Sequence, residues 1–112
     1  MDLCGCRIED QAFAEFFAAA APTKLHTLNL TWCQALTDVT ALAVARDCPH
    51  LRWLSYFGNM NITTDAIEAL AKGPCGPNLR ALVVRGLTKA PEFSTDSRYL
   101  KERFPAVVCT DI

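Results

Sequence analysis

The spacing of leucines is the first regular feature of the chain. Leu25, Leu28 and Leu30 follow the pattern LxxLxL, which turns the side chains of a short strand toward one buried side. Leu51 opens the same pattern 26 residues after Leu25, and Leu79 opens it once more. The spacing therefore predicts three strands, over about residues 27–31, 53–57 and 81–85.

Each predicted strand is followed by apolar residues at helical spacing. Phe13, Phe16 and Phe17 form the predicted inward face of the first helix, and Asp38 is expected to accept hydrogen bonds from N–H groups at the start of the second. Because every connection between strands contains a helix, the strands are expected to be parallel neighbours in one sheet. The helices are predicted over about Asp10 to Ala20, Asp38 to Cys48, Thr64 to Lys72, and Ser94 or Thr95 to Phe104.

These elements together predict an α/β leucine-rich-repeat solenoid, a short arc of about four repeats. The parallel sheet would line the concave face and the helices the convex face, because one strand with one helix cannot bury its apolar side alone. Glu68 and Lys72 are expected to form an exposed pair, and Ala106 to Cys109 a last short strand. The single domain 1–112 would divide into a partial first repeat 1–24, repeats 25–50 and 51–78, and a last repeat with a C-terminal cap 79–112.

Composition and charge restrict the classes of partner. The 112 residues are 51% hydrophobic, with eleven basic and twelve acidic residues giving a net charge of −1. Since no long run of like charge occurs, no nucleic-acid partner is expected. No apolar run is long enough to span a membrane, and the first residues do not resemble a secretory signal. These features predict an intracellular, cytoplasmic protein with reduced cysteines.

The first segment, residues 1–24, resembles a repeat that lacks the beginning of its strand. Leu3, Cys6, Ile8 and Phe13 are expected at an end of the core that no cap covers. This predicts preceding sequence, or a neighbouring chain or self-association at the open N-terminal edge.

The cysteines and histidines are the residues with the greatest potential for metal binding or catalysis. Cys4-Gly5-Cys6 is the most metal-like feature, but Cys6 and Cys33 occupy equivalent positions at which side chains would stack in the core. Asn59 takes the next such position, where it is expected to bond to backbone groups. Neither histidine is placed by the pattern beside a cysteine as a base. No catalytic residue, metal or cofactor is therefore predicted.

Two stretches, LNLTWCQALTD and LAVARDCPHLRWL, are similar to repeats of a known protein family. They resemble the cysteine-containing repeats of F-box/leucine-rich-repeat proteins, the substrate receptors of cullin–RING ubiquitin ligases, although no F-box segment is present in these residues. A second resemblance is carried by MDLCGCRIEDQAF and SRYLKERFPAVVC. These look like the ends of ATP synthase subunit s and related mitochondrial assembly factors. The first resemblance implies ubiquitin-ligase substrate recognition, and the second implies an accessory subunit in mitochondria.

The concave face offers a candidate binding surface, because its side chains alternate with the buried leucines. They are expected in three rows: Thr27, Trp53 and Ala81; Asp2, Asn29, Ser55 and Val83; and Cys4, Thr31, Phe57 and Arg85. Tryptophan, phenylalanine and arginine at such positions are typical of binding hot spots. The hypothesis is a non-enzymatic protein–protein interaction module or scaffold, with a cysteine-dependent redox or zinc protein as an alternative from another class. Trp53, Phe57 and Arg85 are expected to be substantially exposed, with Trp32 at the rim. The predicted protein-binding residues are Asn29, Trp32, Trp53, Ser55, Phe57 and Arg85.

Overall fold

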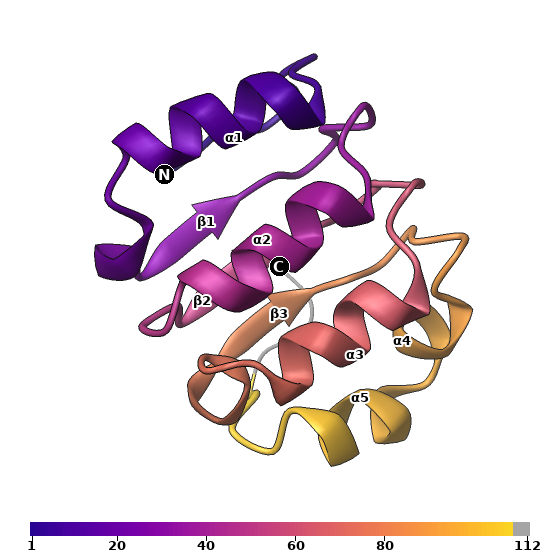
Figure 1. Cartoon of the computed structure of the whole chain (residues 1–112). Helices are drawn as coiled ribbons and strands as arrows, with labels where there is room; N and C mark the ends of the chain where they lie inside the picture. The colour runs from indigo at the N-terminus through magenta and orange to yellow at the C-terminus, as the bar shows by residue number, and fades with distance from the viewer. Residues whose placement is uncertain (109–112) are drawn as a thin grey trace.

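The computed structural model describes residues 1–108, in which α-helices alternate with three short strands (Figure 1). Two single turns of 3₁₀ helix, η1 and η2, precede β1 and β3. In chain order the elements are α1 (Asp10–Ala19), η1 (Pro22–Lys24), β1 (Thr27–Asn29), α2 (Asp38–Asp47), β2 (Trp53–Ser55), α3 (Thr64–Lys72), η2 (Gly76–Asn78), β3 (Ala81–Val83), α4 (Pro91–Thr95) and α5 (Ser97–Arg103).

The strands form one parallel sheet in the order β1-β2-β3, which confirms the predicted pairing. Thr27 lies opposite Trp53, and Trp53 opposite Ala81. Each strand has three residues, fewer than predicted, but backbone hydrogen bonds continue the register beyond it. The N–H of Trp32, for example, donates to the carbonyl of Phe57 at 2.8 Å.

The predicted solenoid of about four repeats is wrong. Five α-helices and a three-stranded sheet, within residues 1–108, form a compact α/β body with principal extents of 35 × 26 × 23 Å. Residues 1–24 contribute an isolated bridge from Asp2 to Asn29 where a strand was expected. Leucine spacing determines which side chains lie between a strand and its helix, and every helix-covered parallel sheet shares that feature. The spacing therefore did not distinguish an open arc from a compact body.

Helices α1, α2 and α3 lie side by side over one face of the sheet (Figure 1). The inward leucines of the strands are fully buried beneath them, as the spacing predicts. Phe13 is buried and stacks on Phe17, so it does not lie at an open end of the core. Leu3 and Ile8 are half-buried, and association at that edge stays a prediction. Phe16, predicted to face inward, is 48% exposed.

Two aspartates join the starts of neighbouring helices. The carboxylate of Asp10 accepts hydrogen bonds from the N–H and hydroxyl of Thr37, and that of Asp38 accepts the same pair from Thr63. Burial alone would raise the pKa of Asp10, but its hydrogen bonds from Thr37 and Thr40 outweigh burial and lower it. The cap of α2 itself is the hydroxyl of Thr37, so the capping role predicted for Asp38 is wrong. Asp38 instead connects α2 to the next segment.

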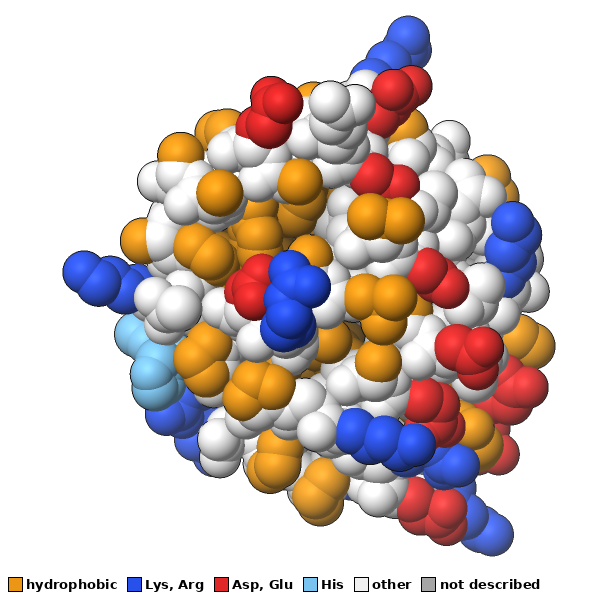
Figure 2. All heavy atoms as spheres, in the orientation of Figure 1, with side chains coloured by type: hydrophobic (Ala, Val, Ile, Leu, Met, Phe, Trp, Pro, Cys, Tyr) orange, Lys and Arg blue, Asp and Glu red, His pale blue; other side chains and the backbone are white. Residues whose placement is uncertain are grey.

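Hydrophobic side chains also lie exposed over the helical layer. Figure 2 shows them in a hollow between α1 and α2, whose volume is about 380 Å³. Val39 and Leu42 line this hollow and are exposed. Within residues 1–108, no helix has the length and apolarity needed to cross a membrane.

The C-terminal part of the chain closes the far side of the body. Asp96 interrupts the single helix predicted there, because its carboxylate accepts the backbone N–H groups of Arg98 and Tyr99 and so starts α5 anew. The described part of the predicted last strand, residues 106–108, is not a strand, although the N–H of Val108 donates to the carbonyl of Arg80 at 2.8 Å. Cys109 lies outside the described residues.

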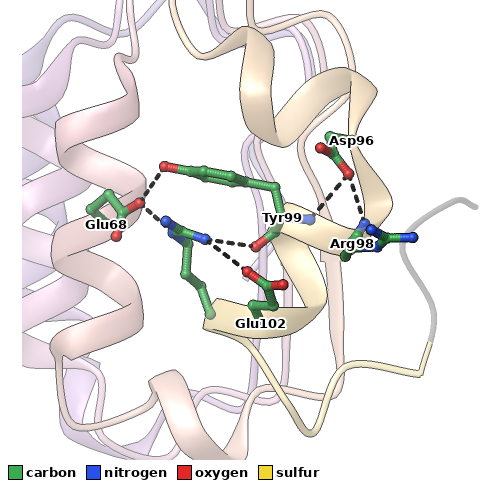
Figure 3. Close-up of polar contacts among 6 residues, drawn as sticks. Glu68, Asp96, Arg98, Tyr99 and Glu102 are labelled. Atoms are coloured by element: carbon green, nitrogen blue, oxygen red, sulfur yellow. Dashed lines mark hydrogen bonds and ion pairs between the residues drawn. The ribbon is translucent and has the colours of Figure 1, made fainter.

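A polar cluster holds α5 against α3 (Figure 3). The carboxylate of Glu68 accepts hydrogen bonds from the hydroxyl of Tyr99, at 2.7 Å, and from the guanidinium of Arg103, which also lies 3.4 Å from the centre of the Tyr99 ring. Partial burial would raise the pKa of Glu68, but these two partners outweigh it and lower the pKa. Glu68 thus bonds to α5 rather than forming the predicted exposed pair with Lys72.

Candidate functional site

The face of the sheet opposite the helices carries the predicted binding residues. Its rows follow the register of the strands: Thr27, Trp53 and Ala81 share one row, and Asn29, Ser55 and Val83 the next. A third row is formed by Thr31, Phe57 and Arg85, because the N–H of Gly58 donates to the carbonyl of Arg85 as that of Trp32 does to Phe57. The rows expected from the sequence are therefore present.

Five of the six predicted residues line one hollow of about 260 Å³ on this face. We call it the aromatic hollow, because three of its walls are aromatic rings. Thr31 and Val83 complete its lining, and sequence reasoning placed both in the same rows without selecting them. The predicted residues that line it are Asn29, Trp32, Trp53, Ser55 and Phe57.

The exposure of these residues is uneven. Trp32 is 49% exposed, whereas Trp53 and Phe57 are half-buried, less exposed than expected. Ser55 is 2% exposed and forms part of the floor. Arg85 is exposed, as expected, but it lines a separate pocket of about 210 Å³ beside α4. Direct contact with a partner is therefore open mainly to the aromatic rings.

The floor of the hollow is a chain of hydrogen bonds. The N–H of Phe57 donates to the hydroxyl of Ser55, and the hydroxyls of Ser55 and Thr31 lie 2.7 Å apart. The hydroxyl of Thr31 also lies 2.6 Å from Oδ1 of Asn29, which can only accept. Since each hydroxyl has one proton, Thr31 donates to Asn29 and Ser55 donates to Thr31. The polar floor is thus largely satisfied internally and offers a polar ligand little.

The wall formed by Trp32 has an unusual backbone. Trp32 has a φ of 59°, in the left-handed region, where a bulky side chain is a rare outlier. The equivalent positions next to the other strands and to the bridge are Gly5, Gly58 and Gly86, all with positive φ. Three of these residues also make the same backbone hydrogen bond. The N–H groups of Gly5, Trp32 and Gly58 each donate to a carbonyl of the neighbouring chain segment. Trp32 therefore occupies a position that the fold otherwise fills with glycine.

The indole of Trp32 is held in place by its neighbours. It meets the ring of Phe57 edge to face, with centroids 5.4 Å apart and an interplanar angle of 75°. It also lies against Gly58, where a Cβ atom would come within 2.5 Å of Cε3 of the indole. The absence of a side chain at Gly58 thus makes room for the ring. Sequence reasoning placed Trp32 at the rim but did not recognise its backbone strain.

The cysteines do not assemble a reactive centre within the described part of the chain. Cys4 and Cys6 are exposed, so Cys6 does not stack in the core as predicted, whereas the other described cysteines are buried. Burial raises the pKa of Cys48 to about 12 and that of Cys75 to about 11, so these thiols stay protonated near neutral pH. No group of three or more His, Cys, Asp or Glu residues in the range 1–108 is arranged to hold a metal ion.

Asn59 departs from its expected role. It is fully buried, yet within the range 1–108 neither polar atom of its side chain has a hydrogen-bond partner. Its equivalent, Cys33, donates its thiol proton to the carbonyl of Leu3 at 3.0 Å.

The sequence matches no known protein family and no curated protein.

Proposed function

We propose that the chain is a non-enzymatic protein–protein interaction module that binds its partner through the aromatic hollow. The observation that carries this proposal is Trp32, an exposed aromatic residue at a backbone position that favours glycine. A left-handed backbone costs roughly 1–2 kcal/mol for a residue with a Cβ atom. A residue retained for packing alone would be expected to bury its ring in return, whereas half of this ring is open to a partner.

The hollow also fits the anatomy of a binding hot spot. Aromatic anchors at hot spots surround a small apolar pocket, and a few such residues supply most of the binding energy. At about 260 Å³, the volume lies below the usual 300–1,000 Å³ of small-molecule and cofactor pockets. A pocket of this size, with a satisfied polar floor, suits one apolar side chain of a partner protein.

Single substitutions test the proposal. Trp53→Ala is expected to weaken partner binding by about 2 kcal/mol or more and, because the ring is only half-buried, to cost less stability than the loss of a fully buried side chain. Leu54→Ala, on the buried face of the same strand, is expected to cost about 2–5 kcal/mol of stability. Val39→Ser is the matched control, since it removes an exposed apolar side chain from the opposite layer and is expected to leave binding unchanged. The measurements are urea unfolding and the affinity for captured partners.

Three results would contradict the hollow as the binding surface. Trp53→Ala could unfold the domain as readily as Leu54→Ala, in which case the ring belongs to packing. Alternatively, Trp53→Ala could leave partner affinity unchanged. A partner that is lost equally with Val39→Ser would also exclude specific contact with the hollow.

The two sequence resemblances define the partner hypotheses. A substrate receptor of a ubiquitin ligase would copurify with ligase subunits from the cytoplasm. An accessory subunit like ATP synthase subunit s would copurify with mitochondrial membrane complexes. Affinity purification from fractionated cells separates the two, provided that a Trp53→Ala bait loses the partner and a Val39→Ser bait keeps it.

The alternative from another class is a cysteine-dependent redox or zinc protein using Cys4 or Cys6. Both thiols are exposed, and a thiol must be accessible to react. Alkylation of the folded protein is expected to modify them and to spare Cys48 and Cys75, whose pKa values burial raises. If alkylation leaves partner binding intact, the protein-binding proposal stands; loss of binding with the thiols modified would favour the alternative.

A further inference from the structure

Basic side chains gather at the edge of the sheet where the strands begin. His26, Arg52 and Arg80 each immediately precede a strand, and the register of the sheet places them in one row. Two further residues, Lys24 and His50, lie two positions before the first and second members of this row. We call these five residues the basic strip; all of them are exposed.

Backbone bonds hold the row together. The N–H of Arg52 donates to the carbonyl of His26 at 2.8 Å, and that of Arg80 donates to the carbonyl of Arg52 at 2.9 Å. The rings of His26 and His50 lie 6.5 Å apart, which places His50 beside the row. Figure 2 shows Lys, Arg and His side chains together at the left edge of the view, where the strands start. Acidic side chains lie mainly on the opposite side of the same view.

The charges of the strip are not matched by acidic neighbours in the described part of the chain. Lys24, Arg52 and Arg80 form no ion pair within residues 1–108, whereas Arg46 pairs with Asp47 and Arg103 with Glu68. Favourable interaction with helix dipoles is the structural alternative, because cations stabilise the carboxyl ends of helices. Such a role fits basic residues in the last turn of a helix, but His26, Arg52 and Arg80 lie directly before the strands, after the loops that follow those turns.

We propose that the basic strip binds an acidic segment of the partner protein. The inference rests on the proposed function and extends it, because Arg52 is followed directly by Trp53, a wall of the aromatic hollow. The strip therefore lies at the start of the strands whose open face carries the hollow. A partner segment with an apolar side chain in the hollow places flanking Asp or Glu residues against the strip, where opposite charges favour association and fix the direction of the segment.

A peptide fits this charge better than a nucleic acid does. Nucleic-acid-binding domains are commonly basic overall, whereas this chain has a net charge of −1 and a pI of about 6.1. Three neighbouring strands extend about 10 Å, enough for two or three carboxylates of a peptide. A stable nucleic-acid complex commonly involves about 6–10 phosphates, which need a longer track of cations.

The test uses three labelled probes and fluorescence anisotropy. The first is a synthetic peptide with one leucine flanked by glutamates, the second has glutamines in place of the glutamates, and the third is single-stranded oligothymidine. The glutamate peptide is expected to bind about tenfold more tightly than the glutamine peptide, and its affinity to fall as salt is added. The variant with both Arg52→Glu and Arg80→Glu is expected to bind it about tenfold more weakly.

A matched variant controls for net charge. Arg7→Glu with Arg98→Glu makes the same change of charge at exposed residues outside the strip, and it is expected to keep the wild-type affinity. Equal weakening by both double variants, equal binding of the two peptides, or no detectable binding of the glutamate peptide would each overturn the proposal. Tighter binding of oligothymidine that depends on Arg52 and Arg80 would also overturn it, in favour of a nucleic-acid partner.

Trp32→Gly separates this inference from the proposed function. If the strip variant releases the glutamate peptide while Trp32→Gly retains it, the basic strip binds acidic segments and the aromatic hollow is not the binding site. If Trp32→Gly releases the cellular partner while the strip variant retains both partner and peptide, the proposed function stands and the acidic segment is excluded.

Discussion

The loops that leave β1 and β2 perform the same task with different residues. Residues 31–33 and 57–59 each turn the chain away from the sheet through a left-handed residue, followed by a buried one. The first loop uses Trp32 and Cys33, and the second uses Gly58 and Asn59. In the first loop the backbone is strained and the buried side chain has a partner. In the second the backbone is relaxed and, within the described residues, the buried side chain has no hydrogen-bond partner.

Each loop has a destabilising feature, namely the strained backbone of Trp32 in the first loop and, in the second, the buried side chain of Asn59, which is unpaired within residues 1–108. The proposed binding function explains the first of these features and not the second. Trp32 directs its ring to the surface, so the strain at its backbone can be offset by binding. Asn59 is enclosed in the core, where it can contribute nothing to contact with a partner. The first loop is therefore where a binding residue is to be sought, and the second is where stability can be gained. Four substitutions, taken from the largest expected effect to the smallest, test the comparison.

Gly58→Ala should have the largest effect. A Cβ atom there combines the cost of a left-handed backbone with a contact of 2.5 Å to the indole of Trp32, which must move. Together these are expected to lower the free energy of unfolding by about 2–3 kcal/mol, as measured in urea. Gly5→Ala is the matched control, because Gly5 has a similar φ of 75° and no atom within 4 Å of the added Cβ. It is expected to cost only about 1 kcal/mol.

The double variant of Gly58→Ala with Trp32→Gly isolates the contact between the two loops. Removing the indole should restore the part of the loss that exceeds the Gly5→Ala value, since only the backbone cost then remains. Additive effects of the two substitutions would show that the ring does not need the space above Gly58.

Cys33→Asn places the buried residue of the second loop in the first. The thiol donates to the carbonyl of Leu3, and an amide can replace that bond but leaves its own oxygen buried. An unsatisfied buried polar group costs about 1–3 kcal/mol, so a loss near 2 kcal/mol in urea unfolding is expected. An unchanged stability would mean that the position accepts polar groups freely and that the comparison of the two buried residues does not hold.

These loops also mark how far the sequence alone predicts the structure. The LxxLxL spacing predicted the burial of Leu28, Leu54 and Leu82 and the rows of the open face, because strand periodicity determines both. The helix in each connection predicted the parallel pairing. The same rows contain four of the five predicted residues that line the aromatic hollow, namely Asn29, Trp53, Ser55 and Phe57. The spacing could not predict the strain at Trp32, because a backbone angle leaves no trace in an apolar pattern.

Features that depend on several segments were missed. The row of His26, Arg52 and Arg80 is invisible as a run of charge, since its members are 26 and 28 residues apart and meet only in the sheet. The compact shape was missed because leucine spacing describes each strand with its helix and not how the ends of the body close. The break at Asp96 was missed because Asp was read as part of a helix when its side chain in fact starts a new one.

Asn59→Cys should raise the stability of the second loop. A buried thiol behaves as a small apolar group, and the substitution removes two polar atoms that have no partner within residues 1–108. A gain of about 1 kcal/mol in urea unfolding is expected. Tyr56→Phe removes a third such atom, the Tyr56 hydroxyl, from the same region and serves as a comparison. A loss of stability in Asn59→Cys would show that the amide is satisfied in solution.

Trp32→Gly should have the smallest effect on stability and the most informative one on function. The substitution loses the edge-to-face contact with Phe57, worth about 0.5–1.5 kcal/mol, and part of the burial of the ring. It also relieves the left-handed strain, worth roughly 1–2 kcal/mol, by restoring the residue type found at the three equivalent positions. Because these changes oppose each other, the free energy of unfolding is expected to change by less than about 1 kcal/mol.

Binding should respond to Trp32→Gly quite differently. Loss of the most exposed wall of the hollow is expected to weaken partner binding by about 2 kcal/mol, a value typical of an aromatic hot spot. Trp32→Ala is the control for strain, because it removes the ring and keeps the costly backbone, so it should bind as weakly as Trp32→Gly and be less stable by about 1 kcal/mol. If Trp32→Gly instead unfolds the protein and Trp32→Ala does so equally, the indole is a packing residue, and the difference between the two loops has no functional meaning.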